Sequence, residues 1–314
     1  MATTVDLTAL LDSCADTVNA ELDSMPTITD VADFDPQDGS QVPIEARNWL
    51  RVRDVVAMVA DLKSSTQLGI GKHAASTASI YQAALQPVVE IFLQFGAGHI
   101  AVHGDCVIGL FWDDMAPERA MCAGITAKTF SERELVPRLE KKWNDEGKLP
   151  ETGFKIGVAM SDLLVKRVGR ARSPHWALVW PGKALNHATK AAQDADAHEL
   201  IVTGSVWDAI SKNEYLTFSC SCRGTPTDNL WKDHEISRLR EDEPDRTGRL
   251  LTACWCPVHG ADFCAAVLKG DTTRSEVTEA LRARKQQWMS SSLARKNAQL
   301  RENRRNLRRA RTGR

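Results

Sequence analysis

The alternation of apolar and polar positions divides the first part of the chain into a helix, a linker, a strand and a second helix. Residues 5–24 place their leucines near helical spacing and predict an amphipathic helix. Residues 25–45 are rich in Pro, Asp and Gly and predict a linker. Residues 54–61 form a nearly continuous β-branched run between two aspartates, which is typical of a buried central strand. Residues 72–95 predict a helix that Pro87 kinks or divides.

Two short apolar runs come next and flank Gly104-Asp105, a dipeptide that predicts a two-residue hairpin. These runs are residues 99–103 and 106–112. The later patterns predict helices at 115–144, 182–196 and 205–212, and strands at 154–160, 163–168, 176–180, 200–203, 215–222 and 230–237. This order of elements predicts an α+β sandwich with a central antiparallel sheet flanked by helices.

The composition is that of an ordinary globular protein. Of the 314 residues, 43% are apolar and 26% are charged, which excludes a mostly disordered or collagen-like chain. No apolar run approaches the roughly 18–20 residues that a membrane span needs. The acidic N-terminus lacks the basic stretch that opens a secretory signal. We therefore expect a cytoplasmic protein whose cysteines are reduced.

The charge is distributed unevenly. Residues 273–314 contain thirteen Lys or Arg and three Glu, a net charge of +10, which leaves −11 on the first 272 residues. Residues 279–314 predict one long basic helix. This helix is either a solvated or dimer-flanking segment or a tail that binds a polyanion. Because Trp288 is its one aromatic residue, we do not expect specific nucleic-acid recognition.

Three cysteines and a histidine near the end of the predicted fold form a candidate metal site. Cys254, Cys256, His259 and Cys264 are residue types that bind zinc. The opening Cys-x-Cys is shorter than the usual Cys-x2-Cys, so a set of buried thiols in a strand and turn is the alternative.

The residues with the clearest chemistry are two aspartates at strand ends. Asp61 ends an apolar strand and Asp105 lies in the predicted hairpin. Two carboxylates on adjacent strands can hold two Mg²⁺ or Mn²⁺ ions about 4 Å apart, as in phosphoryl transfer. Backbone N–H groups in the run Lys63-Ser64-Ser65-Thr66, just before a helix, can receive a triphosphate. The alternative for either aspartate is an exposed turn carboxylate.

These residues resemble the catalytic domain of class III nucleotidyl cyclases. In that family the first metal-binding Asp begins a pattern like Asp-Ile-x-Gly-Phe-Thr, which here reads Asp61-Leu62-Lys63-Ser64-Ser65-Thr66. The second lies in a Gly-Asp hairpin, here Gly104-Asp105. The family then has a Gly followed by Asn and, four residues on, Arg; Gly182, Asn186 and Lys190 stand at these positions, with Lys in place of Arg. The resemblance covers roughly residues 50–240.

The resemblance implies a role for each matching residue. Asp61, Leu62 and Asp105 would hold two divalent metal ions, Mn²⁺ or Mg²⁺. Asn186 would orient the ribose, and Lys190 would meet the charge that develops on the phosphoryl oxygens. The implied residues for the triphosphate are Ser64, Ser65, Thr66 and Lys232, the last of these in a closing hairpin made of residues 218–224 and 230–232.

The resemblance also implies a head-to-tail homodimer with active sites at the interface. Asp61 and Asp105 would come from one protomer. The opposite protomer would supply Asn186, Lys190 and Lys232. The implied organisation is an N-terminal helix and linker at 1–45, a catalytic domain at 46–240 and a C-terminal extension at 241–314 that contains the Cys-rich segment and the basic helix.

Two positions that select a purine base in this family are apolar here. They are Ala101 and, near the Gly–Asn stretch, Val179. The chain is therefore most similar to the bacterial pyrimidine cyclases of the Pycsar anti-phage systems. That similarity implies conversion of UTP to 3′,5′-cyclic UMP and pyrophosphate, and an effector that reads this second messenger without a stable complex. The alternatives are a cytidylate cyclase that makes cyclic CMP and an inactive nucleotide-binding homologue.

A pyrimidine leaves part of a purine pocket unfilled, so large side chains near it become candidates for base contacts. The candidates are Trp49, His103, Trp176 and Trp180. For each tryptophan the alternative is a place in the core.

Overall fold

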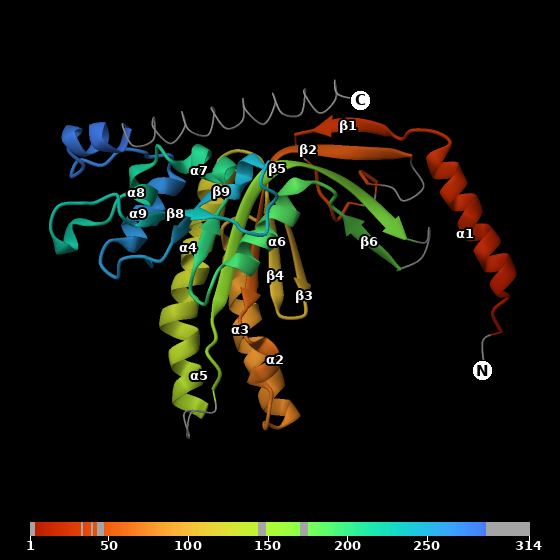
Figure 1. The fold of residues 1–314 in the computed structure, drawn as a ribbon, viewed down its shortest axis with the longest axis horizontal. Coiled ribbons are helices and arrows are strands. Elements are labelled where there is room, and N and C mark those ends of the chain that lie inside the picture. The colour runs from red at the N-terminus through yellow and green to blue at the C-terminus, as the bar shows by residue number, and fades with distance from the viewer. Residues whose placement is uncertain are drawn as a thin grey trace. The chain divides into compact units, whose positions relative to one another are not determined.

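Two compact units make up the chain. The computed structural model describes residues 4–32, 34–38, 40–42, 47–143, 149–169 and 175–286. One unit comprises Met1–Arg53 and Leu164–Pro181, and the other comprises Asp54–Leu163 and Gly182–Arg314. Figure 1 shows the helices and strands in chain order. Among the described residues there is no helix with both the length and the apolar character needed to cross a membrane.

The second unit is built on the strand order β3-β4-β2-β5-β7-β9-β8. The strands are β2 (Asn48–Leu62), β3 (His99–His103), β4 (Cys106–Phe111), β5 (Phe154–Gly169), β7 (Leu200–Val202), β8 (Trp231–Glu235) and β9 (Thr247–Leu251). The expected α+β class is confirmed, but the sheet is mixed. Strand β4 pairs antiparallel with β2 and β3, and β9 with β7 and β8, whereas β5 and β7 are parallel. A helix connects β5 to β7, and such a crossover is what a parallel pair requires.

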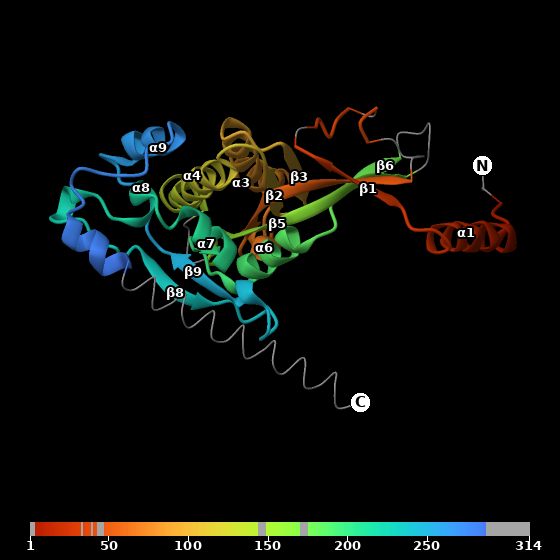
Figure 2. The ribbon, with the colours of Figure 1, turned by 90° about the horizontal axis from the view of Figure 1, so that it is seen from above.

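Helices cover both faces of this sheet. Figure 2 shows α3 (Ala74–Gln94) and α4 (Ala116–Phe130) on one face and α6 (Lys183–Asp194) on the other. Successive side chains of β7 point to opposite faces of the sheet. Leu200 and Val202 lie in the main core, and Ile201 packs on the other face against alanines of α6 and its C-terminal end. A Cβ on Gly157 would lie 2.0 Å from the Ala188 carbonyl oxygen, so only glycine lets α6 approach β5 this closely.

The first unit holds two small strand pairings. Helix α1 (Leu7–Leu22) confirms the expected N-terminal helix; the Asp6 side chain accepts a hydrogen bond from the Ala9 N–H at its start. The linker predicted at 25–45 is wrong in part, because it contains β1 (Thr27–Val31), which pairs in parallel with β2. Strand β6 (Trp176–Val179) pairs antiparallel with the end of β5, as expected from the sequence.

In several places the structure joins elements that the sequence predicts as separate, or divides an element that the sequence predicts as one. Pro87 lies inside α3 without dividing it. The strands predicted at 154–160 and 163–168 are one strand, β5. The helix predicted at 115–144 divides into α4, a π-helical turn at Ser131–Leu135 and α5 (Val136–Trp143). Within that turn, the Ser131 hydroxyl accepts the Phe154 N–H at 2.7 Å and so ties the helix to the start of β5.

The strand predicted at 215–222 is wrong. Its first half is a short helix, α8 (Glu214–Thr217), which begins where the Asn213 side chain accepts the Tyr215 N–H at 3.0 Å. The following carbonyls of Phe218 and Ser219 accept hydrogen bonds from the buried Arg274 guanidinium at 3.1 and 2.9 Å. Because a side chain satisfies these acceptors, no neighbouring strand is needed there.

The remaining helices near the C-terminus are short. They are α7 (Gly204–Ile210), α9 (Gly260–Leu268) and the helical residues 279–286. The rest of the helix predicted at 279–314, with Trp288, lies outside the described residues.

Candidate active site at the ends of β2 and β4

Asp61 and Asp105 lie together at one end of the sheet. Asp61 is paired with Cys106 in the antiparallel register of β2 and β4, so its neighbour across the strands directly follows Asp105. The Leu62 N–H donates to the Asp105 carbonyl oxygen at 3.3 Å. Strand pairing alone therefore brings the two aspartates together, as the hairpin at Gly104-Asp105 implied.

The pKa of the Cys106 thiol reflects the presence of both carboxylates. Burial raises the pKa of Cys106 to about 12, and the negative charges of Asp61 and Asp105 contribute to the rise, with Lys155 opposing them. The thiol thus remains protonated at neutral pH, beside a locally acidic cluster.

Each carboxylate has one close partner. The Ser65 hydroxyl donates to Asp105 Oδ2. The Lys155 Nζ lies 2.6 Å from Asp61 Oδ2, and both side chains are largely shielded from solvent. Lys155 is the second residue of β5, next to β2 in the sheet, and no sequence motif pointed to it. The lysine places a positive charge where a metal ion would meet Asp61.

The turn between β2 and α2 (Ser65–Leu68) is fixed through Lys63. Its backbone N–H donates to the Gly153 carbonyl at 3.0 Å, and its own carbonyl accepts the Thr152 hydroxyl at 2.7 Å. Its Nζ pairs with Glu151 at 2.9 Å and with Asp196. Ser64 then adopts a left-handed conformation, with φ of 57°, directly before α2.

The donor chemistry at this end of the sheet fits a hard divalent cation. Carboxylate and backbone carbonyl oxygens are the ligands that Mg²⁺ and Mn²⁺ prefer. Asp61 and Asp105 supply two carboxylates, and Leu62, which directly follows Asp61 and donates its N–H to the Asp105 carbonyl, adds a backbone carbonyl to this end of the sheet. The pairing of Asp61 with a lysine ammonium shows that this carboxylate already accepts a cation.

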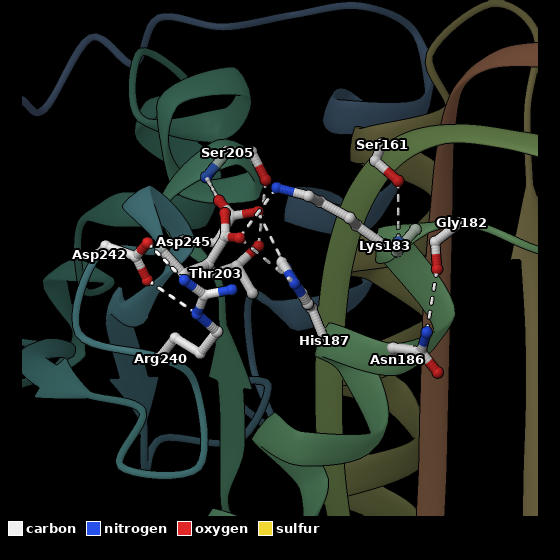
Figure 3. Close-up of polar contacts among 12 residues, drawn as sticks. Ser161, Gly182, Lys183, Asn186, His187, Thr203, Ser205, Arg240, Asp242 and Asp245 are labelled. Atoms are coloured by element: carbon white, nitrogen blue, oxygen red, sulfur yellow. Dashed lines mark hydrogen bonds and ion pairs between the residues drawn. The ribbon is translucent and has the colours of Figure 1, made fainter. Parts of the chain in front are cut away.

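Asn186 and Lys190 lie one turn apart on α6 (Figure 3 shows Asn186). The Asn186 amide donates to the Gly182 carbonyl at 3.2 Å, which turns it toward the start of the helix. A Cβ on Gly182 would lie 2.4 Å from Leu163 Cδ2, so glycine allows the chain to cross β5 as it enters α6. The Ser161 hydroxyl accepts the Ala184 N–H at 2.8 Å and caps the first turn.

The buried face of α6 is held by an acidic loop. His187 Nδ1 lies 3.3 Å from Asp245 Oδ2, and Lys183 Nζ lies 2.8 Å from Glu243 (Figure 3). Burial raises the pKa of Asp245, but hydrogen bonds from His187 and Ser205 outweigh it and lower the pKa below its ordinary value. His187, Glu243 and Asp245 could hold a metal ion by their spacing. Since Lys183 and Ser205 already occupy the two carboxylates, we interpret the group as an ion-pair network.

Comparison with known proteins identifies the family. A family-model scan gives no match. A uridylate cyclase from Micromonospora echinofusca is 51% identical over 296 residues, which span 93% of this chain and 95% of that protein. A uridylate cyclase from Propioniciclava tarda is 45% identical over 269 residues, 85% and 86% of the two chains. This chain belongs to the uridylate cyclase family.

A solved structure supports the fold of this cyclase. The crystal structure of the guanylyl cyclase Cya2 matches with a TM-score of 0.50 and 14% identity, over 67% of this chain and 95% of that one. At this identity the match concerns the fold alone. The class III nucleotidyl cyclase fold expected from the sequence is confirmed.

The residues suggested for base selection in the cyclase lie in different units. Ala101 and His103 are on β3 in the second unit. Val179 ends β6 and Trp180 follows it, in the first unit. Trp180 is 9% exposed and its ring centroid lies 5.9 Å from that of Phe34, so within its own unit it is a core side chain.

The other two tryptophans suggested for base contacts are stacked with cations in the first unit. The Arg167 guanidinium lies 3.9 Å from the centroid of Trp176, and Lys166 Nζ lies 5.6 Å from that of Trp49. Arginine and lysine stack on tryptophan in this way for cation–π stabilisation.

Lys232 lies on β8, where it is paired with Leu250 of β9. The closing hairpin expected from residues 218–224 and 230–232 is therefore wrong, because β8 pairs with β9 instead. Lys232 lines an open pocket with a volume of about 460 Å³, together with Trp207, Thr217, Asp228, Trp231, Asp233 and Lys285.

The sequence left open whether Cys254, Cys256, His259 and Cys264 bind zinc or are buried thiols, and the structure does not bring these four together. Cys254 donates to Glu132 at 3.0 Å, and Cys264 is hydrogen-bonded with Cys122. The remaining two, Cys256 and His259, meet Cys220 and Cys222 from a segment more than thirty residues earlier.

Proposed function

We propose that this cyclase converts UTP to 3′,5′-cyclic UMP and pyrophosphate. The observation that carries the proposal is that Asp61 and Asp105 lie together at one end of the sheet. The chain that contains them is about half identical to a protein named uridylate cyclase. Loss of these carboxylates would remove the metal-binding capacity of the site, whereas the chain retains both.

The proposed cofactors are two divalent ions, Mn²⁺ or Mg²⁺. The Asp61 and Asp105 carboxylates and the Leu62 carbonyl would hold them. When bound, the ions would lower the pKa of the ribose 3′-hydroxyl and neutralise charge on the triphosphate.

The turn after β2 would receive the triphosphate. Lys63 fixes this turn through its backbone and its ammonium, so the backbone of Ser64, Ser65 and Thr66 is held before substrate arrives. A preorganised set of backbone donors stabilises phosphate charge without having to reorganise. Lys232 would add a cation from the opposite protomer.

Asn186 and Lys190 would act on the reacting end of the nucleotide. The Asn186 amide orients the ribose, so that the 3′-oxygen lies in line with the α-phosphorus. The 3′-oxygen forms a bond to that phosphorus, its proton passes to solvent, and the bond to the bridging oxygen of pyrophosphate breaks. Lys190 stabilises the charge that builds on the phosphoryl oxygens as a point charge.

The proposed assembly is a head-to-tail homodimer in which each active site takes residues from two chains. One protomer contributes Asp61 and Asp105, and the other contributes Asn186 and Lys190. The proposed catalytic domain spans residues 46–240, flanked by the leader at 1–45 and the extension at 241–314.

Base choice would depend on Ala101, His103 and Val179, whereas Trp180 is a core side chain of its own unit. The apolar side chains at 101 and 179 lack the groups that read a purine edge. UTP and CTP exchange donor and acceptor at two ring positions, so a site that hydrogen-bonds one rejects the other. The names of both relatives favour UTP.

In the cell, we propose that cyclic UMP acts as a second messenger in anti-phage defence. The enzyme would act in the cytoplasm, and a separate effector would bind the released product. No stable complex between enzyme and effector is required, because the messenger diffuses.

The deciding experiment incubates the full-length protein with Mn²⁺ and each of ATP, GTP, CTP and UTP, and separates the products by chromatography. We expect cyclic UMP and pyrophosphate from UTP and little product from the other three. Asp61→Asn and Asp105→Asn should each reduce the rate by at least about a hundredfold, in line with the size of metal contributions to such barriers.

Three results would contradict the proposal. Cyclic CMP as the main product would move the base assignment to cytosine. Cyclic AMP or cyclic GMP would overturn the pyrimidine assignment. A product that persists in both aspartate variants would remove the carboxylates from the mechanism.

A further inference from the structure

Three cysteines and one histidine from two distant segments converge in the second unit. Their ligand atoms all lie within 4.8 Å of one another. We call this group the thiol–imidazole cluster; its members are Cys220, Cys222, Cys256 and His259. The first two lie at the 3₁₀ turn Ser221–Arg223, and the last two lie between β9 and α9.

The spacing inside the thiol–imidazole cluster matches a tetrahedral zinc site. Cys222 Sγ lies 3.6 Å from Cys256 Sγ and 3.2 Å from His259 Nδ1, and Cys256 Sγ lies 3.9 Å from the same nitrogen. Zinc bonds of about 2.3 Å to sulfur and about 2.0–2.1 Å to nitrogen place tetrahedral ligands about 3.5–3.8 Å apart. The three measured distances bracket this range.

The same distances argue against a disulfide. A disulfide requires an S–S separation of about 2.05 Å. All eight cysteines are free thiols, and the Cys222–Cys256 pair is 3.6 Å apart. The sulfurs are thus at the distance of two ligands that share an ion, well beyond a covalent bond.

One half of the cluster is preformed by a backbone turn. The Gly260 N–H donates to the Cys256 carbonyl at 2.8 Å and closes the turn Cys256-Pro-Val-His-Gly. The turn thus holds Cys256 and His259 side by side, with Cys256 Sγ 3.9 Å from His259 Nδ1, before any ion is bound.

We propose that the thiol–imidazole cluster binds one structural Zn²⁺ ion. Four protein ligands leave no open coordination position, which distinguishes a structural zinc from a catalytic one. On binding, the three thiols lose their protons to solvent and the imidazole binds as the neutral ring. The ion would fasten the segment after α8 to the segment that joins β9 to α9.

Two nearby thiols provide matched controls. Cys254 and Cys264 flank Cys256 and His259 in sequence, but they contact Glu132 and Cys122 instead. A ligand set chosen by sequence spacing would include both of them and omit the two cysteines of the earlier segment. Substitution at these positions therefore distinguishes the ligand set of the structure from that of local spacing.

The test measures metals in the full-length protein, purified without a polyhistidine tag or chelator, by inductively coupled plasma mass spectrometry. We expect about one zinc per chain, about tenfold less in Cys222→Ser and His259→Ala, and about one in Cys254→Ser and Cys264→Ser. His259→Cys should retain zinc, because four thiolates also form a zinc site. This variant separates loss of a ligand from loss of the fold.

A second readout is the spectrum of the protein reconstituted with Co²⁺. Tetrahedral thiolate ligands give intense visible bands, which should vanish in Cys222→Ser and persist in Cys254→Ser. Absence of zinc from wild-type protein grown in zinc-supplemented medium would overturn the proposal. So would iron in place of zinc, a Cys222–Cys256 disulfide in freshly purified protein, or zinc loss in the two control variants.

Discussion

Lys155 gives the carboxylate end of the sheet a property that the two aspartates alone would not have. Its ammonium lies 2.6 Å from Asp61 and lowers the local negative charge. At the proposed metal site, an ion bound by Asp61 would share the carboxylate with this lysine or displace it. Metal affinity would then reflect a competition between cations as well as the number of carboxylates.

Replacing Lys155 should alter the binding of metal ions at the proposed site. We expect Lys155→Met to bind Mn²⁺ about three- to tenfold more tightly, since the variant removes both a competitor for Asp61 and a repelling charge. Free Mn²⁺ measured by electron paramagnetic resonance during a titration checks this directly. Lys212→Met, at an exposed lysine, is the control. Unchanged or weaker Mn²⁺ binding would mean that Lys155 supports the site instead of competing for it.

At the residue scale, part of the proposed site could be predicted because each of its residues lies in a short motif that resembles the cyclase family. Asp61, Asp105 and the α6 pair were found from local motifs, and β-strand register then brought the two aspartates together. Lys155 and the cluster partners Cys220 and Cys222 could not be found this way. Their contacts depend on pairings across tens of residues, for which the sequence offers no local signal.

At the scale of elements, the last described helix is anchored by charges. Arg282 pairs with Glu214 at 2.7 Å, and the Lys285 Nζ donates to the Thr217 hydroxyl, so residues 279–286 dock on α8. Burial lowers the pKa of Lys285 to about 8, with Glu214 and Asp228 opposing the shift. A largely buried ammonium is thus retained at neutral pH at a cost in stability.

The cost of burying the Lys285 ammonium predicts that the stability of the folded chain depends on pH. Between pH 8 and pH 10.5 the unfolded chain keeps the Lys285 proton while the folded chain releases it, so this lysine makes stability rise with pH. Below pH 8 the penalty is complete, at most about 3 kcal/mol. Lys285→Met should therefore raise the free energy of unfolding at pH 7 by about 1–3 kcal/mol.

Urea unfolding across pH 7 to 10.5 checks this expectation. The difference between Lys285→Met and the wild type should shrink as the pH rises, whereas Lys212→Met should differ from the wild type by a constant amount. A destabilised Lys285→Met protein at pH 7 would show that the hydrogen bond to Thr217 outweighs the cost of burial.

Elements were predicted well where the pattern of apolar residues along the chain matches the pattern of burial. The central part of β2, helix α3 and the hairpin of β3 and β4 follow directly from apolar patterning. The segment at 215–222 alternates like a strand but folds as α8 and a turn. Arg274, more than fifty residues further on, supplies the hydrogen bonds that a neighbouring strand would have provided.

At the scale of the whole molecule, the proposed dimer makes a prediction about mixtures. Asp105→Ala and Asn186→Ala chains should each be inactive alone. Mixed in equal amounts, half of the dimers are heterodimers with one intact site of two, so about a quarter of the wild-type activity should return. The measurement is cyclic UMP formation after the chains have exchanged.

The control mixture combines Asp61→Ala with Asp105→Ala. Both changes lie on the same side of the proposed site, so neither site of a heterodimer is intact and no activity should return. No activity in the first mixture would rule out sites shared between protomers, and recovery in the control would show that Asp61 and Asp105 of one site come from different chains, against the proposed division.

The position of β9 bears on how the protein is made. Strand β9 lies between β7 and β8 in the sheet, although it follows both in the chain. A ribosome synthesises the chain from its N-terminus, so β7 and β8 leave it before the strand that joins them exists. Until Leu251 has emerged, two sheet edges remain unpaired and open to pairing with other chains. Completion of the sheet therefore waits for a segment that is made after both of the strands it joins.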